Sequence, residues 1–132
     1  MTDSVLTDHV VTFPDGLPGF EDTRQFMLVV SSALHPFTLL QGTGMDAPCF
    51  VGIDPVRVDP GFPTTLSSAD RARLRVGDDD PLVWLALVTA RPDGDTTVNL
   101  RAPIVINPAA MRGIQVLAGE SPYRLDHPLG LR

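Results

Sequence analysis

The density of proline and glycine sets the tightest limit on what this chain can fold into. Its 132 residues include 13 prolines and 11 glycines, which interrupt short apolar runs at intervals of about a dozen residues. Proline fixes φ and lacks an amide donor, so helices have little room. We therefore predict an all-β fold, a small antiparallel β-barrel-like single domain over residues 1–132 with one short helix. We expect the first eight residues and the last few to be poorly ordered.

The predicted strands are rich in Val, Leu, Ile, Phe and Thr. The run 82–88 is apolar at every position, which indicates a central strand covered on both faces, with Trp84 in or beside the core. The helix is predicted to begin at residue 67 or 68, where a serine can cap it, and to end at about residue 74. The predicted strands cover residues 9–13, 26–30, 37–40, 49–53, 82–90, 97–101, 104–107 and 113–118.

Turn residues predict how some of these strands connect. Asp93-Gly94 lies between two predicted strands and is typical of a tight antiparallel hairpin. Pro103 cannot donate to a ladder, so we expect it to mark a strand start, a bulge or an edge and to bend the segment 97–107. Gly113 is predicted to adopt a positive φ as the chain returns in a second hairpin across a six-residue loop.

The charge balance excludes some partner classes. The formal net charge is −6, fourteen of the sixteen acidic residues are Asp, and all ten basic residues are Arg. Such a chain repels a polyanion, because nucleic-acid binding draws most of its non-specific affinity from cations that neutralise phosphates. The same field attracts a basic protein and raises the encounter rate. We therefore predict protein partners and no direct nucleic-acid binding.

The chain also lacks the features of a membrane or secreted protein. No apolar run approaches the roughly 20 residues that cross a bilayer, and no basic segment precedes an apolar one at the N-terminus. We expect a cytoplasmic protein with no membrane contact. Cys49 is the single cysteine, and its place in an apolar strand predicts a small buried hydrophobic residue.

No catalytic pattern emerges from the sequence. His9, His35 and His127 lack metal-ligand spacing, and no phosphate loop or nucleophile elbow occurs. The acidic run at residues 78–80 does not place its oxygens at the alternating positions of a calcium loop. We therefore predict no catalytic residue, no metal and no cofactor.

The candidate partner-binding residues are polar groups at predicted strand ends and turns. Acidic residues precede and follow the predicted central strand, which spans roughly 30 Å, so they form two acidic ends and not one patch. A solvated turn is the alternative for the acidic run. For the amides, and for Gln115 and Tyr123, the alternative is that they satisfy backbone groups where strands bulge or turn. The candidates are Asp78, Asp79, Asp80, Asp93, Asp95, Asn99 and Asn107.

Two longer segments consist mainly of residues that fix the backbone path or anchor apolar side chains. Residues 13–20 read Phe-Pro-Asp-Gly-Leu-Pro-Gly-Phe, and residues 99–107 read Asn-Leu-Arg-Ala-Pro-Ile-Val-Ile-Asn. Both resemble characteristic segments of the flagellar assembly factor FliW family. The likeness extends through Asp54-Pro55, through residues 113–117 and through Tyr123 with 127–129, roughly residues 9–129 in all. One departure is Asp126, because family members often carry an arginine there.

The resemblance implies a non-enzymatic protein that binds two others. These are CsrA, a small dimeric RNA-binding translational repressor, and flagellin, the filament subunit. The two compete, so export of flagellin releases the factor to antagonise the repressor. An alternative is a dedicated flagellin chaperone without a translational role, in which an open strand edge near Pro103 pairs with an extended client segment. A small-molecule enzyme or ligand-binding barrel would require a titratable constellation that the sequence does not display.

Overall fold

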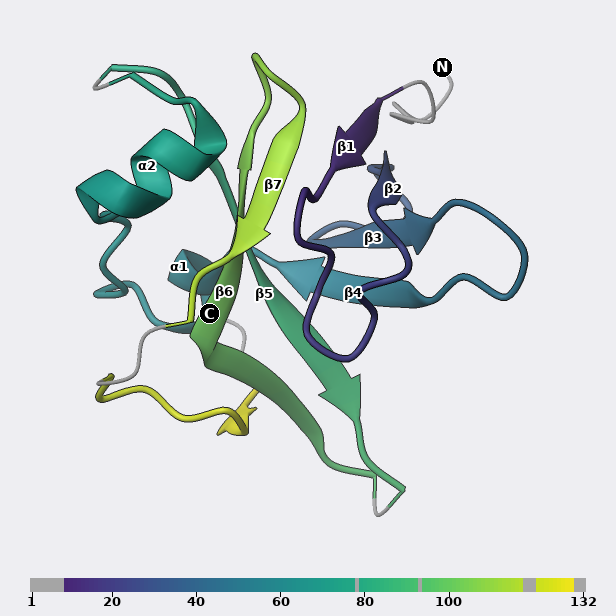
Figure 1. Cartoon of the computed structure of the whole chain (residues 1–132). Helices are drawn as coiled ribbons and strands as arrows, with labels where there is room; N and C mark the ends of the chain where they lie inside the picture. The colour runs from purple at the N-terminus through teal and green to yellow at the C-terminus, as the bar shows by residue number, and fades with distance from the viewer. Residues whose placement is uncertain (1–8, 78, 93, 118–120, 130–132) are drawn as a thin grey trace.

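Seven strands close into a barrel in the computed structural model of the chain, which describes residues 9–77, 79–92, 94–117 and 121–129 (Figure 1). The order around the ring is β5-β4-β3-β2-β1-β7-β6, and β5 pairs with β6 to close it. Neighbours are antiparallel except β1 and β7, and β8 pairs with β6 outside the ring. The strands are β1 (Val10–Thr12), β2 (Gln25–Val29), β3 (Phe37–Gly42), β4 (Cys49–Ile53), β5 (Val83–Ala90), β6 (Thr96–Asn107), β7 (Arg112–Gln115) and β8 (His127–Pro128). The predicted all-β barrel is confirmed.

Two short helices accompany the barrel in the described part of the chain, so the prediction of one helix is wrong. The predicted helix is α2 (Ser68–Leu74), which begins where Ser67 Oγ accepts a hydrogen bond from Asp70 N at 3.1 Å. The second is α1 (Pro55–Val58), a single turn capped by Asp54. The sequence contains a signal for α1, because an Asp at the N-cap followed by Pro at the first helical position favours the start of a helix.

The prediction of two strands at 97–101 and 104–107 is wrong, because both belong to the continuous β6. Its pairing with β5 shifts register: Leu85 lies opposite Ile104, whereas Leu87 lies opposite Asn99. Four residues of β6, 100–103, therefore face the single residue Ala86 of β5. Pro103 lies in this bulge, as its missing donor predicted. Figure 1 shows the resulting bend, where β6 leaves β7 and runs towards the hairpin with β5.

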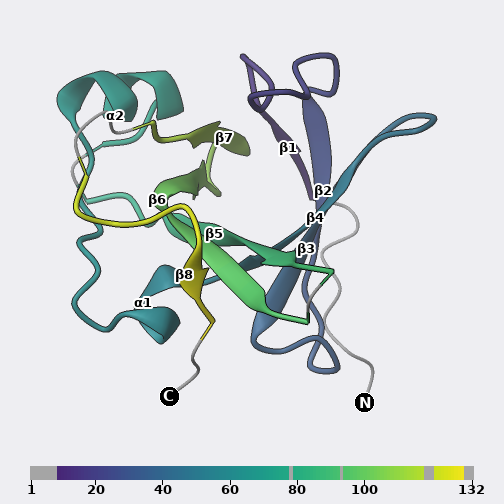
Figure 2. The ribbon, with the colours of Figure 1, turned by 90° about the horizontal axis from the view of Figure 1, so that it is seen from below.

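The β5–β6 pair is covered on both faces, which confirms the predicted central strand. Leu85 and Leu87 point into the barrel, where they join the largest aromatic and aliphatic core. Ala86 and Val88 point outwards and pack in a second cluster under α1 and the C-terminal segment. Trp84 packs in that cluster and in a third cluster under α2. Figure 2 shows both helices and β8 on one side of this pair.

Two further expectations are wrong. Cys49 is exposed, because it is the first residue of β4 and lies beyond the point where β5 pairs with that strand. Gly113 does not have a positive φ; Met111 takes that conformation, with φ of 51°, and β7 begins directly after it at Arg112. Glycine is required at 113 for another reason: an added Cβ would lie 2.6 Å from the ring of Phe13.

Candidate protein-interaction groove

An apolar groove opens at one mouth of the barrel. It has a volume of about 300 Å³, and it is continuous with the barrel interior, because the buried core residue Leu17 and the part-buried Phe50 and Leu87 belong to both. We call it the mouth groove. Its lining consists of Leu17, Pro18, Phe20, Phe50, Leu87, Asn99, Ala102, Gln115, Leu117 and Leu125.

The mouth groove is an exposed apolar surface without charge. Phe20, Leu117 and Leu125 are 44%, 68% and 61% exposed, and they are three of the six large hydrophobic residues exposed in the described part of the chain. None of the ten lining residues carries a charge. A contiguous exposed apolar patch of this kind is typical of a protein-interaction site.

Residues 13–20 form one wall of the mouth groove through a tightly folded loop. Gly16 has φ of 66°, and a Cβ there would lie 2.7 Å from the Cα of Glu21, so only glycine fits. Gly19, with φ of 87°, donates its N–H to Glu21 Oε2 at 3.0 Å, which lowers the pKa of Glu21. This path places the ring of Phe20 edge-on to Phe50, with centroids 5.1 Å apart.

The bulge of β6 forms the opposite wall, and polar side chains hold its shape. Asn99 Oδ1 accepts hydrogen bonds from the backbone N–H groups of Arg101 and Ala102, each at 3.0 Å. Gln115 Nε2 donates to the carbonyl of Ala102 at 2.9 Å. The side-chain amides of Asn99 and Gln115 thus bond to backbone groups that the register shift leaves without partners in the β5–β6 ladder. This is the structural alternative stated for both residues from the sequence.

The strand edge beside Pro103 is occupied, so the idea of an open edge there is wrong. The carbonyl of Pro103 accepts a hydrogen bond from the N–H of Val116 at 2.9 Å. Leu100 N donates to the carbonyl of Arg124 in the C-terminal segment at 3.2 Å. The bulge is therefore covered by neighbouring segments of the same chain.

Asn107 is buried and structural. It is 1% exposed, and its Nδ2 donates to the carbonyls of Leu74 and Arg75 at 2.9 and 3.3 Å. Its Oδ1 accepts from Ala109 N at 3.1 Å. The side chain thus joins the end of α2 to the turn after β6, and its burial leaves almost no surface for a partner to contact.

The acidic candidates lie away from the mouth groove and fall in two places, one on each side of β5. Asp79 and Asp80 are exposed just before β5, and Asp95 is exposed in the hairpin after it. Figure 1 shows these two connections at opposite ends of β5. Asp78 and Asp93 lie outside the described residues. The structure therefore brings Asn99 to the groove, whereas Asp79 and Asp80 are exposed at one end of β5 and Asp95 is exposed at the other.

The C-terminal segment forms the outer rim of the mouth groove beside Leu125. Arg124 Nε donates to Asp126 Oδ1 at 3.0 Å, and Arg91 lies 4.0 Å from the same carboxylate. The hydrogen bond from Arg124 is the main cause of a lowered pKa at Asp126. Asp126 therefore lies between two arginines, and this part of the rim next to Leu125 carries a net positive charge.

Tyr123 is a partly buried residue that packs against the second hydrophobic cluster. Its ring packs against Phe62 with centroids 5.0 Å apart. Desolvation, and secondarily the neighbouring carboxylate of Asp59, raise the pKa of the Tyr123 phenol. The role of Tyr123 is structural, but its phenol interacts with the carboxylate of Asp59 and not with a backbone group as the sequence-based alternative had it.

Most residues of the mouth groove were not predicted from the sequence. The sequence indicated Asn99, but not Phe50, Leu87, Leu117 or Leu125. Leu117 lies beyond the end of β7 at Gln115, although the predicted strand ran to residue 118, and Leu125 lies in no strand, so only tertiary structure brings the two side chains together. Among the described residues, no three His, Cys, Asp or Glu side chains gather as a metal site would require. No helix in the described ranges has the length and hydropathy of a membrane span.

Comparisons with known proteins agree on one family. The FliW protein family model matches residues 2–129. The flagellar assembly factor FliW of Syntrophotalea carbinolica is 36% identical over 122 residues, which cover 92% of this chain and 87% of that protein. The flagellar assembly factor FliW of Anoxybacillus flavithermus is 37% identical over 123 residues, covering 91% and 83%. A crystal structure of the flagellar assembly factor FliW superposes with a TM-score of 0.82 at 31% identity, covering 96% of this chain and 89% of the other.

Proposed function

The chain belongs to the FliW family of flagellar assembly factors, and from this we propose that it is a non-enzymatic cytoplasmic protein that couples flagellin synthesis to flagellin export. In this proposal it binds a CsrA-type translational repressor and antagonises its RNA binding, and it also binds flagellin. Export of flagellin frees the protein for the repressor. In this proposal the protein itself binds no nucleic acid, membrane or cofactor.

The observation that carries the proposal is the convergence of the family's segments on the mouth groove. Residues 13–20 supply Leu17, Pro18 and Phe20, the bulge of β6 supplies Asn99 and Ala102, and residues 113–117 supply two more lining side chains. Most of these residues shape the backbone or expose apolar surface. A site built in this way supports binding of another protein through surface complementarity.

The two partners call for different surface chemistry. A repressor that binds RNA carries a basic surface, and the net charge of −6 would steer it towards this protein. The mouth groove lacks charged lining residues, so it suits an apolar segment of a client. We therefore assign the groove to flagellin, and the exposed carboxylates at the two ends of β5 (Asp79 and Asp80 at one, Asp95 at the other) to the repressor.

A binding titration tests the proposal. The host's CsrA protein and flagellin are each titrated alone and in competition, at two salt concentrations. We expect one protein per CsrA chain, a CsrA affinity that falls at high salt, and displacement of one partner by the other. No detectable complex with either partner would refute the proposal.

A matched pair of variants tests the assignment of the groove. Leu125→Asp places a charge in the apolar lining and should weaken flagellin binding about tenfold or more. Met45→Asp is the control, because Met45 is 94% exposed and does not line the groove. Equal flagellin affinity for both variants would contradict the assignment.

The exposed apolar groove also favours a second candidate, a flagellin chaperone without a translational role. Shielding an apolar client segment needs only the groove. The same titration separates the two functions, since a chaperone would bind flagellin and leave the CsrA–RNA complex unchanged.

A further inference from the structure

The barrel is split open between β4 and β5 next to the mouth groove. The two strands pair through Ile53–Ala86, Gly52–Leu87 and Val51–Val88, and their pairing stops there. Beyond that point β4 continues for two residues along β3, and β5 continues along β6. Figure 1 shows β4 and β5 diverging from this point. We call this opening the split.

The backbone of β4 directs one unpaired residue into the split. Gly42 N donates to the carbonyl of Pro48 at 2.8 Å, so the polar groups of Pro48 face β3. In a strand the N–H and C=O of one residue share a side, and successive residues alternate. The N–H and C=O of Cys49 therefore face away from β3 and into the split.

The backbone of β5 does the same from the other side. Arg91 N donates to the carbonyl of Asp95 at 2.7 Å, so the polar groups of Arg91 face β6. The N–H and C=O of Ala90 therefore face away from β6. Continuing the register of Val51 with Val88 would pair Cys49 with Ala90, but the strands have separated. Neither residue has a ladder partner across the split among the described residues.

The side chains beside the split belong to the mouth groove. Phe50 of β4 and Leu87 of β5 both line it, and Phe20 packs on Phe50. An extended segment that hydrogen-bonds to Cys49 or Ala90 would place alternate side chains into this apolar surface. A helix would use its own backbone groups internally and leave both edges unpaired.

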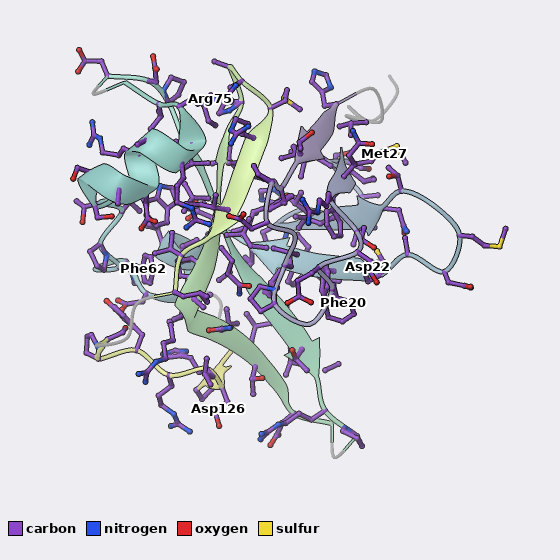
Figure 3. All side chains as sticks on the ribbon, in the orientation of Figure 1. Phe20, Asp22, Met27, Phe62, Arg75 and Asp126 are labelled. Atoms are coloured by element: carbon purple, nitrogen blue, oxygen red, sulfur yellow. The ribbon has the colours of Figure 1, made fainter. Side chains whose placement is uncertain are left out.

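The charges beside the split define the segment further. Glu21 and Asp22 are exposed next to Phe20, and neither forms an ion pair with a described residue. Figure 3 shows Phe20 and Asp22 on the same loop, in front of β4. A basic residue at the corresponding end of the segment would be favoured there.

We propose that a short extended segment of flagellin adds as a strand in the split between β4 and β5. Its groove-facing side chains are apolar and uncharged, and a basic residue lies towards Glu21 and Asp22. This inference rests on the proposed function, since it names the mode by which the flagellin client is held.

Flagellin titration with two variants at one position tests the added strand. Ala90→Pro removes the N–H that faces the split but no hydrogen bond to β6, and it should lower flagellin affinity about tenfold. Ala90→Ser keeps the N–H and should bind within about twofold of the unchanged protein. Circular dichroism and thermal unfolding check that both variants fold.

Amide hydrogen exchange by NMR provides a second measurement on the unchanged protein, so the test holds even if Ala90→Pro does not fold. Exchange at Cys49 and Ala90 should slow at least about tenfold in the flagellin complex. Thr89 is the internal reference, because its amide already faces β6.

Unchanged exchange at both Cys49 and Ala90, or a folded Ala90→Pro variant with full affinity, would overturn the added strand while leaving flagellin binding intact. Self-association of the free protein that Ala90→Pro abolishes would instead assign the split to a second copy. No flagellin binding by the unchanged protein would refute the proposed function itself.

Discussion

Replacing Gly113 by alanine should destabilise the barrel because the new methyl group would collide with a locked ring. The added Cβ would lie 2.6 Å from both Cε2 and Cζ of Phe13. Phe13 is fully buried, and its ring meets Phe26 edge-on with centroids 5.4 Å apart, so it has no space to move away. Overpacking of this kind destabilises a protein by about 1–3 kcal/mol. Alanine also lowers the conformational entropy of the unfolded chain relative to glycine, which stabilises the folded protein by about 0.4–1 kcal/mol. We therefore expect Gly113→Ala to lower the free energy of unfolding by about 1 kcal/mol, the difference between an overpacking cost of about 2 kcal/mol and this entropic gain.

A double-mutant cycle isolates this contact. Phe13→Leu removes the colliding ring atoms and by itself should cost about 1–1.5 kcal/mol through the space it leaves. In that background Gly113→Ala should cost little, so the two effects should be non-additive by about 2 kcal/mol. Urea unfolding with an unchanged m-value measures each free energy.

The control for the cycle is Gly61→Ala, where the nearest atom to an added Cβ is Asp59 Oδ1 at an ordinary 3.5 Å. We expect it to stay within about 0.5 kcal/mol of the unchanged protein. Additive effects of Gly113→Ala and Phe13→Leu, or no effect of Gly113→Ala, would refute the reasoning that links these two family segments through one contact.

Two further predictions concern polar groups. Asn107→Ala should lower the free energy of unfolding by about 3 kcal/mol, because the carbonyl of Leu74 and the N–H of Ala109 lose their hydrogen-bond partner. Urea unfolding measures this free energy, and a loss below about 1 kcal/mol would contradict the structural role of Asn107. Arg124 lowers the pKa of Asp126 below its ordinary 3.8, so the stabilisation by Asp126 is present above that pH and is lost as the pH falls through the lowered value. When thermal unfolding is measured at pH values from 5 downwards, Asp126→Asn should therefore lose less stability with falling pH than the unchanged protein. The same loss of stability in both proteins would count against the Arg124–Asp126 contact.

Local patterns in the sequence were enough to predict the fold class and most of the strands. Thirteen prolines leave few stretches for helices, and Asp93-Gly94 marks the β5–β6 hairpin because the turn needs a residue that accepts positive φ. Here Gly94 has φ of 97°. Ser67 likewise predicted the start of α2. Each of these signals depends on only a few neighbouring residues, so it can be recognised without knowledge of the rest of the chain.

Predictions that depended on distant contacts failed. Gly113 was assigned to a turn, but its role is to leave room for Phe13, one hundred residues earlier in the chain. Cys49 was assigned to the core from its apolar neighbours, yet it is exposed where β4 and β5 separate. Neither outcome is encoded in the flanking residues.

The sequence by itself determined that this chain forms short strands joined by rigid turns, and it carried the segments that mark the FliW family. Only the tertiary structure decided where those segments meet. The mouth groove exists because barrel closure brings distant residues to one opening, next to the point where β4 and β5 separate; these residues include Leu17, Pro18, Phe20, Asn99, Ala102, Gln115, Leu117 and Leu125. Periodicity reports which face of a strand is apolar, but the pairing register and the point where two strands separate depend on packing across the whole barrel.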